Sequence, residues 1–519
     1  VDLIVHNAIV YTVDNDFKTA QAFAVKNGLF LGIGKSVDIL KKYSSKKIID
    51  AKAKPIYPGF YDPHSHFFNY AQTLWQADLV GTKSFNEIIQ RLKLFNAQHP
   101  DSKWIMGRGW DQNDWAVKQF PSKELLDKAF PKKPVALVRV DGHAMILNSE
   151  ALKLAEITSN TKVDGGLVEL KNGEPTGILV DNAMRLARQV FPKPTKAELT
   201  KMLLAAQKEC FKLGLTTISD AGINTLEIEL LDELNKANQL KIRDYAMIRM
   251  SVENLDYYLK KGVYKTERLN VRSFKIVGDG ALGSRGACLL EPYSDSPTEG
   301  FLLSSYTVLD QNISRIYNSD FQANTHCIGD STNRLILDIY GKNLKGKNDR
   351  RWRIEHAQIV TKVDLPKFGK YSIIPSIQTT HATSDMYWAG DRLGAERLKT
   401  AYGFKDLLEQ NGLLANGSDF PVEAVNPLFG FHSAVARQDA KNFPTDGFQM
   451  ENVITRQQAL KAMTIWAAYA NFEEKERGSI EVGKMADFVL LEADLMKIDQ
   501  KKLRNVKVLS TFLGGEKVF

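Results

Sequence analysis

The chain has 519 residues, a formal net charge of +8, 44% hydrophobic residues and 25% charged residues. These values are typical of a globular protein with room for one large α/β domain and a smaller companion. Basic and acidic residues are interspersed along the whole chain, and no basic cluster contains interleaved aromatics. The composition therefore argues against a nucleic-acid partner.

The cysteines and the hydropathy of the sequence exclude further classes of protein. Cys210, Cys288 and Cys327 are an odd number and lack the C-x-x-C spacing, which argues against a disulfide framework and a cysteine-based zinc site. No apolar run is long enough to cross a membrane. The sequence starts at Val1 rather than Met. We therefore expect a soluble protein, either cytoplasmic or, with a targeting segment removed, exported or periplasmic.

Both ends of the chain are rich in short β-type runs. In residues 1–56, Asn27-Gly28 lies between two apolar runs and predicts a hairpin turn. In residues 470–519, Gly514-Gly515 predicts another hairpin. We expect these two segments to form one small composite β-sandwich domain.

The middle of the chain, residues 57–469, alternates strand-like and helix-like runs. Helices are expected, for example, at 195–213 and 227–239. Eight candidate strands lie at 56–66, 212–220, 241–250, 271–279, 321–326, 351–356, 371–378 and 412–419. Eight β/α repeats predict a (β/α)8 TIM barrel, whose chemistry lies at the C-terminal ends of its strands.

The interval between the first two candidate strands is too long for one βα unit. Residues 67–195 contain strand-like runs of their own at 134–140, 166–170 and 177–179, and the aromatic-rich motif GRGWDQNDW at 107–115. We predict an inserted subdomain that covers the mouth of the barrel.

Ionisable residues gather at the ends of the candidate strands. His64 and His66 are two residues apart, so in a strand their imidazoles point to the same face. An isolated H-x-H pair is more often two polar residues in a turn. Four of the nine histidines, however, lie at such strand ends together with one carboxylate: His64, His66, His326, His356 and Asp419.

This set favours a metal site. Neutral imidazoles and carboxylates hold zinc while leaving one position open for water. The bound metal makes that water acidic enough to attack near neutral pH. Asp419 is suited to take up a proton and pass it to a departing amine.

Lys275 and Asp279 lie on the fourth candidate strand. Lys275 could act as a neutral amine, react with CO₂ to form a carbamate that bridges two metals, or serve as a salt-bridged structural lysine. Asp279, further along the same face, could be its partner in each case.

The motifs together resemble the amidohydrolase superfamily, and specifically amidohydrolase family 3, the YtcJ-like branch. They span nearly the whole chain. The matching motifs are PGFYDPHSH at 58–66, DGHAMILNS at 141–149, KIVGDGALGSRGA at 275–287, THCIGD at 325–330, RIEHAQ at 353–358, THATSDMYWAG at 380–390, GSDFPVE at 417–423 and GSIEVGKMADFVLL at 478–491.

The resemblance implies a metal-dependent hydrolase that cleaves a carbon–nitrogen bond of a small, non-peptide amide. It implies one or two divalent metal ions, zinc foremost, held by His64, His66, His326, His356, Asp419 and a carboxylated Lys275. Asp419 would also be the general base and acid, and His326 would take part in catalysis. The expected substrate contacts are His143, His381, Arg285, Asp279 and Trp110.

Three alternatives stay open at this point. Deamination of a cyclic amidine or heterocycle usually needs no lysine on the fourth strand, so Lys275 weighs against it. Ester or phosphoester hydrolysis could use the same centre. A scaffold without catalysis is disfavoured because every ligand position is filled. The expected binding partner is a small-molecule amide substrate. The chain could also form a homodimer.

Overall fold

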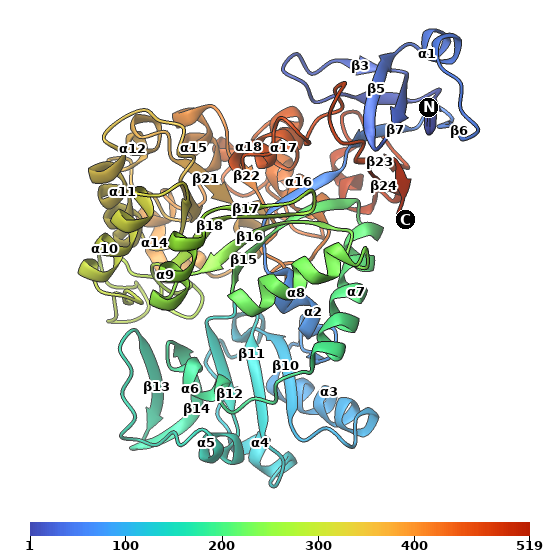
Figure 1. Ribbon diagram of the computed structural model, residues 1–519. Coiled ribbons are helices and arrows are strands. Elements are labelled where there is room, and N and C mark those ends of the chain that lie inside the picture. Colours follow the sequence, from blue (N-terminus) through green and yellow to red (C-terminus); the bar gives the residue numbers. More distant parts are fainter.

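The computed structural model describes residues 1–519. Figure 1 shows a β-sandwich that carries both termini, a central barrel, and an inserted sheet on the far side of the barrel from the sandwich. None of the helices combines the length and apolar character that a membrane-spanning helix needs.

Eight parallel strands form the nearly closed barrel predicted from the sequence. The backbone N–H of Asp419, beyond the last strand, donates to the His64 carbonyl oxygen at 2.8 Å and links the last strand back to the first. The strands are β8 (Phe60–Ser65), β15 (Leu215–Ile223), β16 (Arg243–Arg249), β18 (Leu269–Val277), β19 (Gln322–Cys327), β20 (Arg353–His356), β21 (Ile374–Ile377) and β22 (Ala415–Asn416). The short β17 (Tyr264–Lys265) pairs antiparallel with β18.

Helices follow most barrel strands and cover the outside of the barrel. The expected helices near 195–213 and 227–239 are observed as α7 (Lys196–Lys212) and α8 (Thr225–Lys236), and a capping box starts each one. Others that enclose the barrel or flank its mouth are α2 (Phe67–Thr73), α9 (Val252–Lys261), α10 (Tyr306–Tyr317), α11 (Asp330–Leu344), α12 (Leu365–Lys370), α13 (Thr379–Asp385), α14 (Ala389–Leu398), α15 (Phe404–Asn411), α16 (Pro427–Ala436), α17 (Arg456–Ala462) and α18 (Ile465–Ala470).

The insert between β8 and β15 is a six-stranded sheet with apolar clusters on its two faces. Its strands, in spatial order, are β13 (Gly166–Lys171), β14 (Glu174–Asp181), β12 (Ala144–Leu147), β11 (Val135–Arg139), β10 (Ile105–Trp110) and β9 (Ala77–Asp78). The helices of the insert are α3 (Phe85–Gln98), α4 (Glu124–Ala129), α5 (Ser149–Leu154) and α6 (Met184–Arg188). The three strand-like runs expected in this region are observed as β11, β13 and β14.

Two sheets form the sandwich, and residues from both ends of the chain fill its core. Phe23 and Phe30 from the N-terminal segment pack against Phe488 and Phe512 from the C-terminal segment. One sheet contains β5 (Leu29–Gly34), β4 (Ala22–Lys26), β1 (Leu3–His6) and β6 (Ile48–Asp50). The other contains β25 (Glu516–Lys517), β24 (Val508–Leu513), β23 (Phe488–Leu491), β7 (Pro55–Pro58), β2 (Ile9–Tyr11) and β3 (Thr19–Ala20).

Both expected hairpins are present in the sandwich, at Asn27-Gly28 between β4 and β5 and at Gly514-Gly515 between β24 and β25. The composite sandwich is therefore confirmed. The domain limits at residues 56, 67, 195 and 470 stay predictions.

Candidate metal centre

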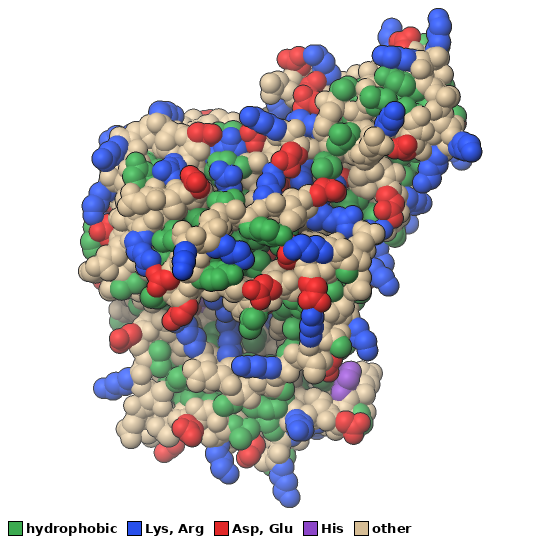
Figure 2. All heavy atoms as spheres, viewed as in Figure 1, with side chains coloured by type: hydrophobic (Ala, Val, Ile, Leu, Met, Phe, Trp, Pro, Cys, Tyr) green, Lys and Arg blue, Asp and Glu red, His purple; other side chains and the backbone are tan.

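A cavity of about 780 Å³ opens at the C-terminal ends of the barrel strands, and the insert supplies part of its wall. In the view of Figure 2 the surface is recessed between the barrel and the insert. Six predicted site residues line the cavity: His66, His143, His326, His356, His381 and Asp419. The C-terminal ends of the barrel strands thus meet at a real cavity, as the TIM-barrel arrangement requires.

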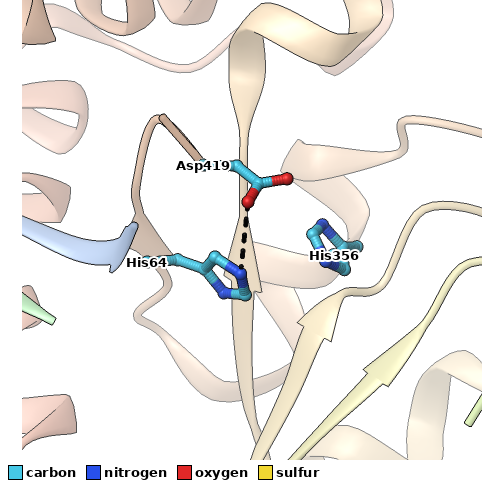
Figure 3. Close-up of side chains that lie close together, drawn as sticks. All are labelled: His64, His356 and Asp419. Atoms are coloured by element: carbon cyan, nitrogen blue, oxygen red, sulfur yellow. Dashed lines mark ion pairs between the residues drawn. The ribbon is translucent and has the colours of Figure 1, made fainter. Parts of the chain in front are cut away.

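Three buried side chains converge at the floor of this cavity. Single donor atoms of His64, His356 and Asp419 all lie within 4.8 Å of one another (Figure 3). They come from the end of β8, the end of β20 and the loop after β22. His66 also reaches this point, with its Nε2 3.2 Å from Asp419 Oδ1, while His64 Nε2 lies 3.6 Å from the same oxygen. The two imidazoles of the H-x-H motif therefore share one carboxylate.

The backbone is strained at two of these residues. His356 has φ of 72° and Asp419 has φ of 61°, a left-handed conformation that non-glycine residues seldom adopt. Such strain persists only where the surrounding structure enforces it, and it concentrates at functional sites. Here the two strained residues are His356 and Asp419, whose side chains both point to the candidate metal centre.

Hydrogen bonds orient the imidazoles of the cluster. His64 Nδ1 bonds to the Glu355 carboxylate, which Arg353 also holds through a 2.6 Å ion pair. His356 Nδ1 donates to Gln378 Oε1 at 2.6 Å. With Nδ1 committed in both rings, each Nε2 keeps its lone pair, the arrangement found in metal-binding histidines.

The protonation states fit the needs of a metal ion. Burial, assisted by nearby Lys275, lowers the pKa of His64 to about 4, and burial also lowers the pKa of His356 well below its usual range. Burial alone would raise the pKa of Asp419, but the His66 and His64 imidazoles outweigh it and hold that pKa well below its usual range. Neutral imidazoles beside an ionised carboxylate are the donors that divalent zinc binds.

An unsatisfied polar atom supports the same interpretation. Asp419 Oδ1 is buried and makes no well-aligned hydrogen bond despite its 3.2 Å approach to His66. A buried acceptor without a partner is costly, and an ion at this position would satisfy it.

The two other predicted ligands lie beside this cluster. Lys275 is buried, and its Nζ lies 3.1 Å from His64 Nε2. Burial lowers its pKa, which favours the neutral amine that carbamate formation requires. His326 is one ring further away, 4.5 Å from His356 between ring centroids, and its Nε2 lies 3.3 Å from the Gly280 carbonyl oxygen.

Two predicted substrate contacts line the cavity close to the cluster. His143, from the insert, bonds through Nδ1 to Asp181 at 2.6 Å, and its ring lies 5.1 Å from that of His326. His381, on α13, stacks 5.8 Å from the His356 ring. Its Nε2 lies 3.6 Å from Asp419 Oδ2 and has no hydrogen-bond partner.

The three other predicted substrate contacts, Trp110, Arg285 and Asp279, are not among the residues that line the cavity. Trp110 is fully buried in the apolar core of the insert, where its indole N–H donates to the Leu137 carbonyl oxygen at 2.9 Å. Arg285 is engaged in an ion pair with Asp295 at 2.8 Å. These two side chains therefore serve the packing of the insert and the shape of a loop.

Asp279 lies between two loops at the C-terminal ends of the barrel strands. Its carboxylate is fully buried and accepts backbone N–H groups of Cys288, Ile328 and Gly329 at 3.0, 3.1 and 2.8 Å. It thus ties the loop after β18 to the loop after β19, and its Oδ1 lies 3.5 Å from His326 Nε2 rather than beside Lys275.

Several cavity residues were missed at the sequence level. Arg108 lies in the GRGWDQNDW motif, and its guanidinium lines the cavity with Nε unpartnered. Asp385 and Glu423, which lie within two of the matched motifs, also line the cavity. Glu355 was detectable, because Arg353 and Glu355 are two residues apart on one strand and so share a face.

Comparisons with known proteins relate the whole chain to a family of hydrolases. The sequence model of the amidohydrolase family matches residues 47–519. The YtcJ protein of Bacillus subtilis is 31% identical over 526 residues, which cover 99% of this chain and 98% of the relative. The N-substituted formamide deformylase of Arthrobacter pascens is 24% identical over 535 residues, covering 99% of this chain and 97% of that protein. The crystal structure of an uncharacterized metal-dependent hydrolase from Pyrococcus horikoshii superimposes with a TM-score of 0.78 at 27% identity, covering 96% of this chain and 99% of that one.

Proposed function

Because this chain belongs to the amidohydrolase family, we propose that it hydrolyses a carbon–nitrogen bond in a small, non-peptide amide. The observation that carries the proposal is the convergence of His64, His356 and Asp419 donor atoms within 4.8 Å at the floor of an open cavity. The Arthrobacter relative is named for its action on N-substituted formamides, which are amides of this kind.

The proposed metal is zinc, as one or two ions. His64, His66, His356 and Asp419 would hold it, with His326 and a carboxylated Lys275 completing a second position. These nitrogen and oxygen donors are those that zinc prefers in catalytic sites. When bound, the metal supplies a Lewis acid and a water acidic enough to serve as nucleophile near neutral pH.

The side chains would then divide the remaining work. Asp419, ionised at neutral pH, accepts a proton from the attacking water and returns it to the departing amine nitrogen. His381, with its free Nε2, and His143 hold the amide oxygen from two sides of the cavity. His326 supports the negative charge that develops on that oxygen.

The test measures metal content and turnover together. The zinc-loaded protein is assayed against a panel of N-formyl and N-acyl amines, before and after removal of metal by a chelator. We expect turnover that is lost with the metal and restored by zinc. For Asp419→Asn we expect kcat to fall by about 100-fold or more, the usual range for loss of a general acid or base.

The same assay separates the alternatives. Ammonia release from cyclic amidines without amide turnover would favour deamination, and ester turnover alone would favour an esterase. A zinc-loaded protein that turns over no compound of the panel would favour a scaffold. An Asp419→Asn variant with full activity would remove Asp419 from the mechanism.

A further inference from the structure

One wall of the cavity carries two carboxylates that no lysine or arginine of the chain pairs with. Asp385, the last residue of α13, and Glu423, in the loop after β22, both line the cavity. Their hydrogen-bond donors are neutral groups: the Tyr402 hydroxyl donates to Asp385 at 2.8 Å and the Ser384 hydroxyl donates to Glu423 at 2.7 Å. Neither interaction compensates the negative charge.

The two carboxylates face the same small region. Ser384 Oγ, which bonds to Glu423, also lies 3.3 Å from Asp385 Oδ1, so both acids lie within hydrogen-bonding distance of one hydroxyl oxygen. Burial raises the pKa of Asp385 to about 7, to which the nearby Glu423 adds, and burial also raises the pKa of Glu423. A cation placed between them would relieve the repulsion.

A second acidic pair in the cavity shows what compensated carboxylates look like. Asp111 and Asp141 also line the cavity, but the buried Arg139 forms ion pairs with both. The cation that interacts with Glu423 at longer range, Arg504, stacks on the Phe429 ring at 3.8 Å and forms no salt bridge. The chain thus supplies an arginine to Asp111 and Asp141 and leaves Asp385 and Glu423 without a cationic partner.

An independent feature connects this wall to the candidate metal centre. His381 is only 9% exposed, and its Nε2 is buried in the cavity wall without a hydrogen-bond partner. The Ser384 hydroxyl that bonds to Glu423 also lies 3.3 Å from the His381 carbonyl oxygen, and His381 Nε2 lies 3.6 Å from Asp419. A molecule that extends from the metal centre to the acidic wall would therefore pass His381 Nε2, which is free to form a hydrogen bond with it.

We propose that this acidic wall, formed by Asp385 and Glu423, binds a basic group of the substrate, an ammonium or amidinium. The inference rests on the proposed function and specifies its substrate class as amides with a cationic substituent. An organic cation fits better than a second metal, because Asp385 and Glu423 do not join the donor atoms that converge within 4.8 Å. A charge-assisted hydrogen bond to either carboxylate would orient the amide over the metal centre.

The experiment compares matched pairs of acetamides on the zinc-loaded, full-length protein. One member carries an ω-aminoalkyl chain of two to five methylenes, and the other carries a methyl group in place of the ammonium. We expect kcat/KM to favour the cationic member by about tenfold or more at the best chain length. A wild type that treats both members alike, or prefers the neutral one, would overturn the proposal.

Two variants locate the effect. In the combined variant Asp385→Asn, Glu423→Gln we expect the preference to fall to about twofold or less. Asp78→Asn removes a carboxylate from the insert side of the same cavity and should retain the preference. If the combined variant keeps the full preference, the basic group binds elsewhere.

A binding measurement distinguishes failure of this inference from failure of the proposed function. Butylammonium and neutral butanol are titrated calorimetrically into the wild type and the combined variant. Tighter binding of butylammonium that depends on the two carboxylates supports the acidic wall even if no amide is hydrolysed. Equal binding of the two probes contradicts it even if amides are hydrolysed.

Discussion

At the residue scale, Glu355 determines which nitrogen of His64 faces the candidate metal centre. It is fully buried, bonds to His64 Nδ1 and forms an ion pair with Arg353. In Glu355→Gln the carboxylate charge is lost, so the preference of His64 for a free Nε2 weakens. We expect zinc affinity to fall about 10- to 100-fold, measured by competition with a chromogenic chelator.

The same substitution leaves Arg353 as a buried, unpaired cation. We expect the free energy of unfolding to fall by about 3 kcal/mol, since breaking a buried pair by removing one partner carries this order of cost. Glu396→Gln, on an exposed part of α14, is the matched control and should change neither quantity. Unchanged zinc affinity in Glu355→Gln would show that His64 needs no such orientation.

The candidate metal ligands were predictable from the sequence because they lie at the ends of the predicted strands and within recognisable motifs. The substrate side was less predictable. Arg285 and Asp279 lie in one matched motif and Trp110 lies in the aromatic-rich motif of the insert, yet Trp110 packs in an apolar core, Arg285 pairs with Asp295, and Asp279 accepts hydrogen bonds from loop backbone N–H groups. Whether such a side chain faces the cavity depends on the three-dimensional path of its loop, which residue type alone does not specify.

At the scale of elements, the eight barrel strands were predictable because strand-like and helix-like runs alternate along residues 57–469. β10 was not, because its sequence, IMGRGW, contains two glycines, which weaken strand propensity. Gly109 has φ of 108°, and a Cβ there would lie 2.4 Å from the Val80 side chain. The close approach of β10 to Val80 therefore requires a glycine at position 109. The same glycine makes β10 difficult to recognise as a strand from the sequence.

Arg139, at the end of β11, holds the loops of the insert against the cavity. It pairs with Asp111 and Asp141, and Asp141 in turn accepts the backbone N–H of His143 at 3.0 Å. In Arg139→Met both carboxylates lose their cation. We expect about 3 kcal/mol lower stability in urea unfolding, faster hydrogen exchange in the insert and a raised KM.

Arg139→Lys should restore little of this loss, because a lysine cannot bridge two carboxylates with the planar fork of arginine. Arg185→Met, at a solvent-exposed position of α6, is the control and should behave like the wild type. Full stability of Arg139→Lys would mean that charge alone, rather than geometry, holds these loops.

At the scale of the whole molecule, a buried ion pair joins the sandwich to the barrel. Arg243, at the start of β16, contacts Asp487, directly before β23, at 2.8 Å. Asp487 also accepts the backbone N–H of Gly514 at 2.7 Å, in the hairpin between β24 and β25. The sequence predicted the composite sandwich from its turn signals, but this joint connects residues 244 positions apart, and nothing local to either residue predicts it.

The joint predicts a pH dependence of stability. Burial alone would raise the pKa of Asp487, but Arg243 outweighs it and holds the pKa below its ordinary value. The unfolded chain therefore binds this proton more readily than the folded protein. The ion pair contributes its full stability above the unfolded pKa of about 3.9 and loses it as the pH falls through the folded pKa.

Asp487→Asn keeps an acceptor for Gly514 and removes only the charge. At pH 7 we expect the variant to be about 3 kcal/mol less stable than the wild type, because the buried Arg243 then keeps only the solvent-exposed Glu267 as an ion-pair partner. Denaturant unfolding at a series of pH values should show this difference shrinking below about pH 4, where the wild-type carboxylate also becomes protonated. A difference that stays constant from pH 7 to pH 3 would mean that the pair acts through shape rather than charge, and that the sandwich is held to the barrel by apolar packing.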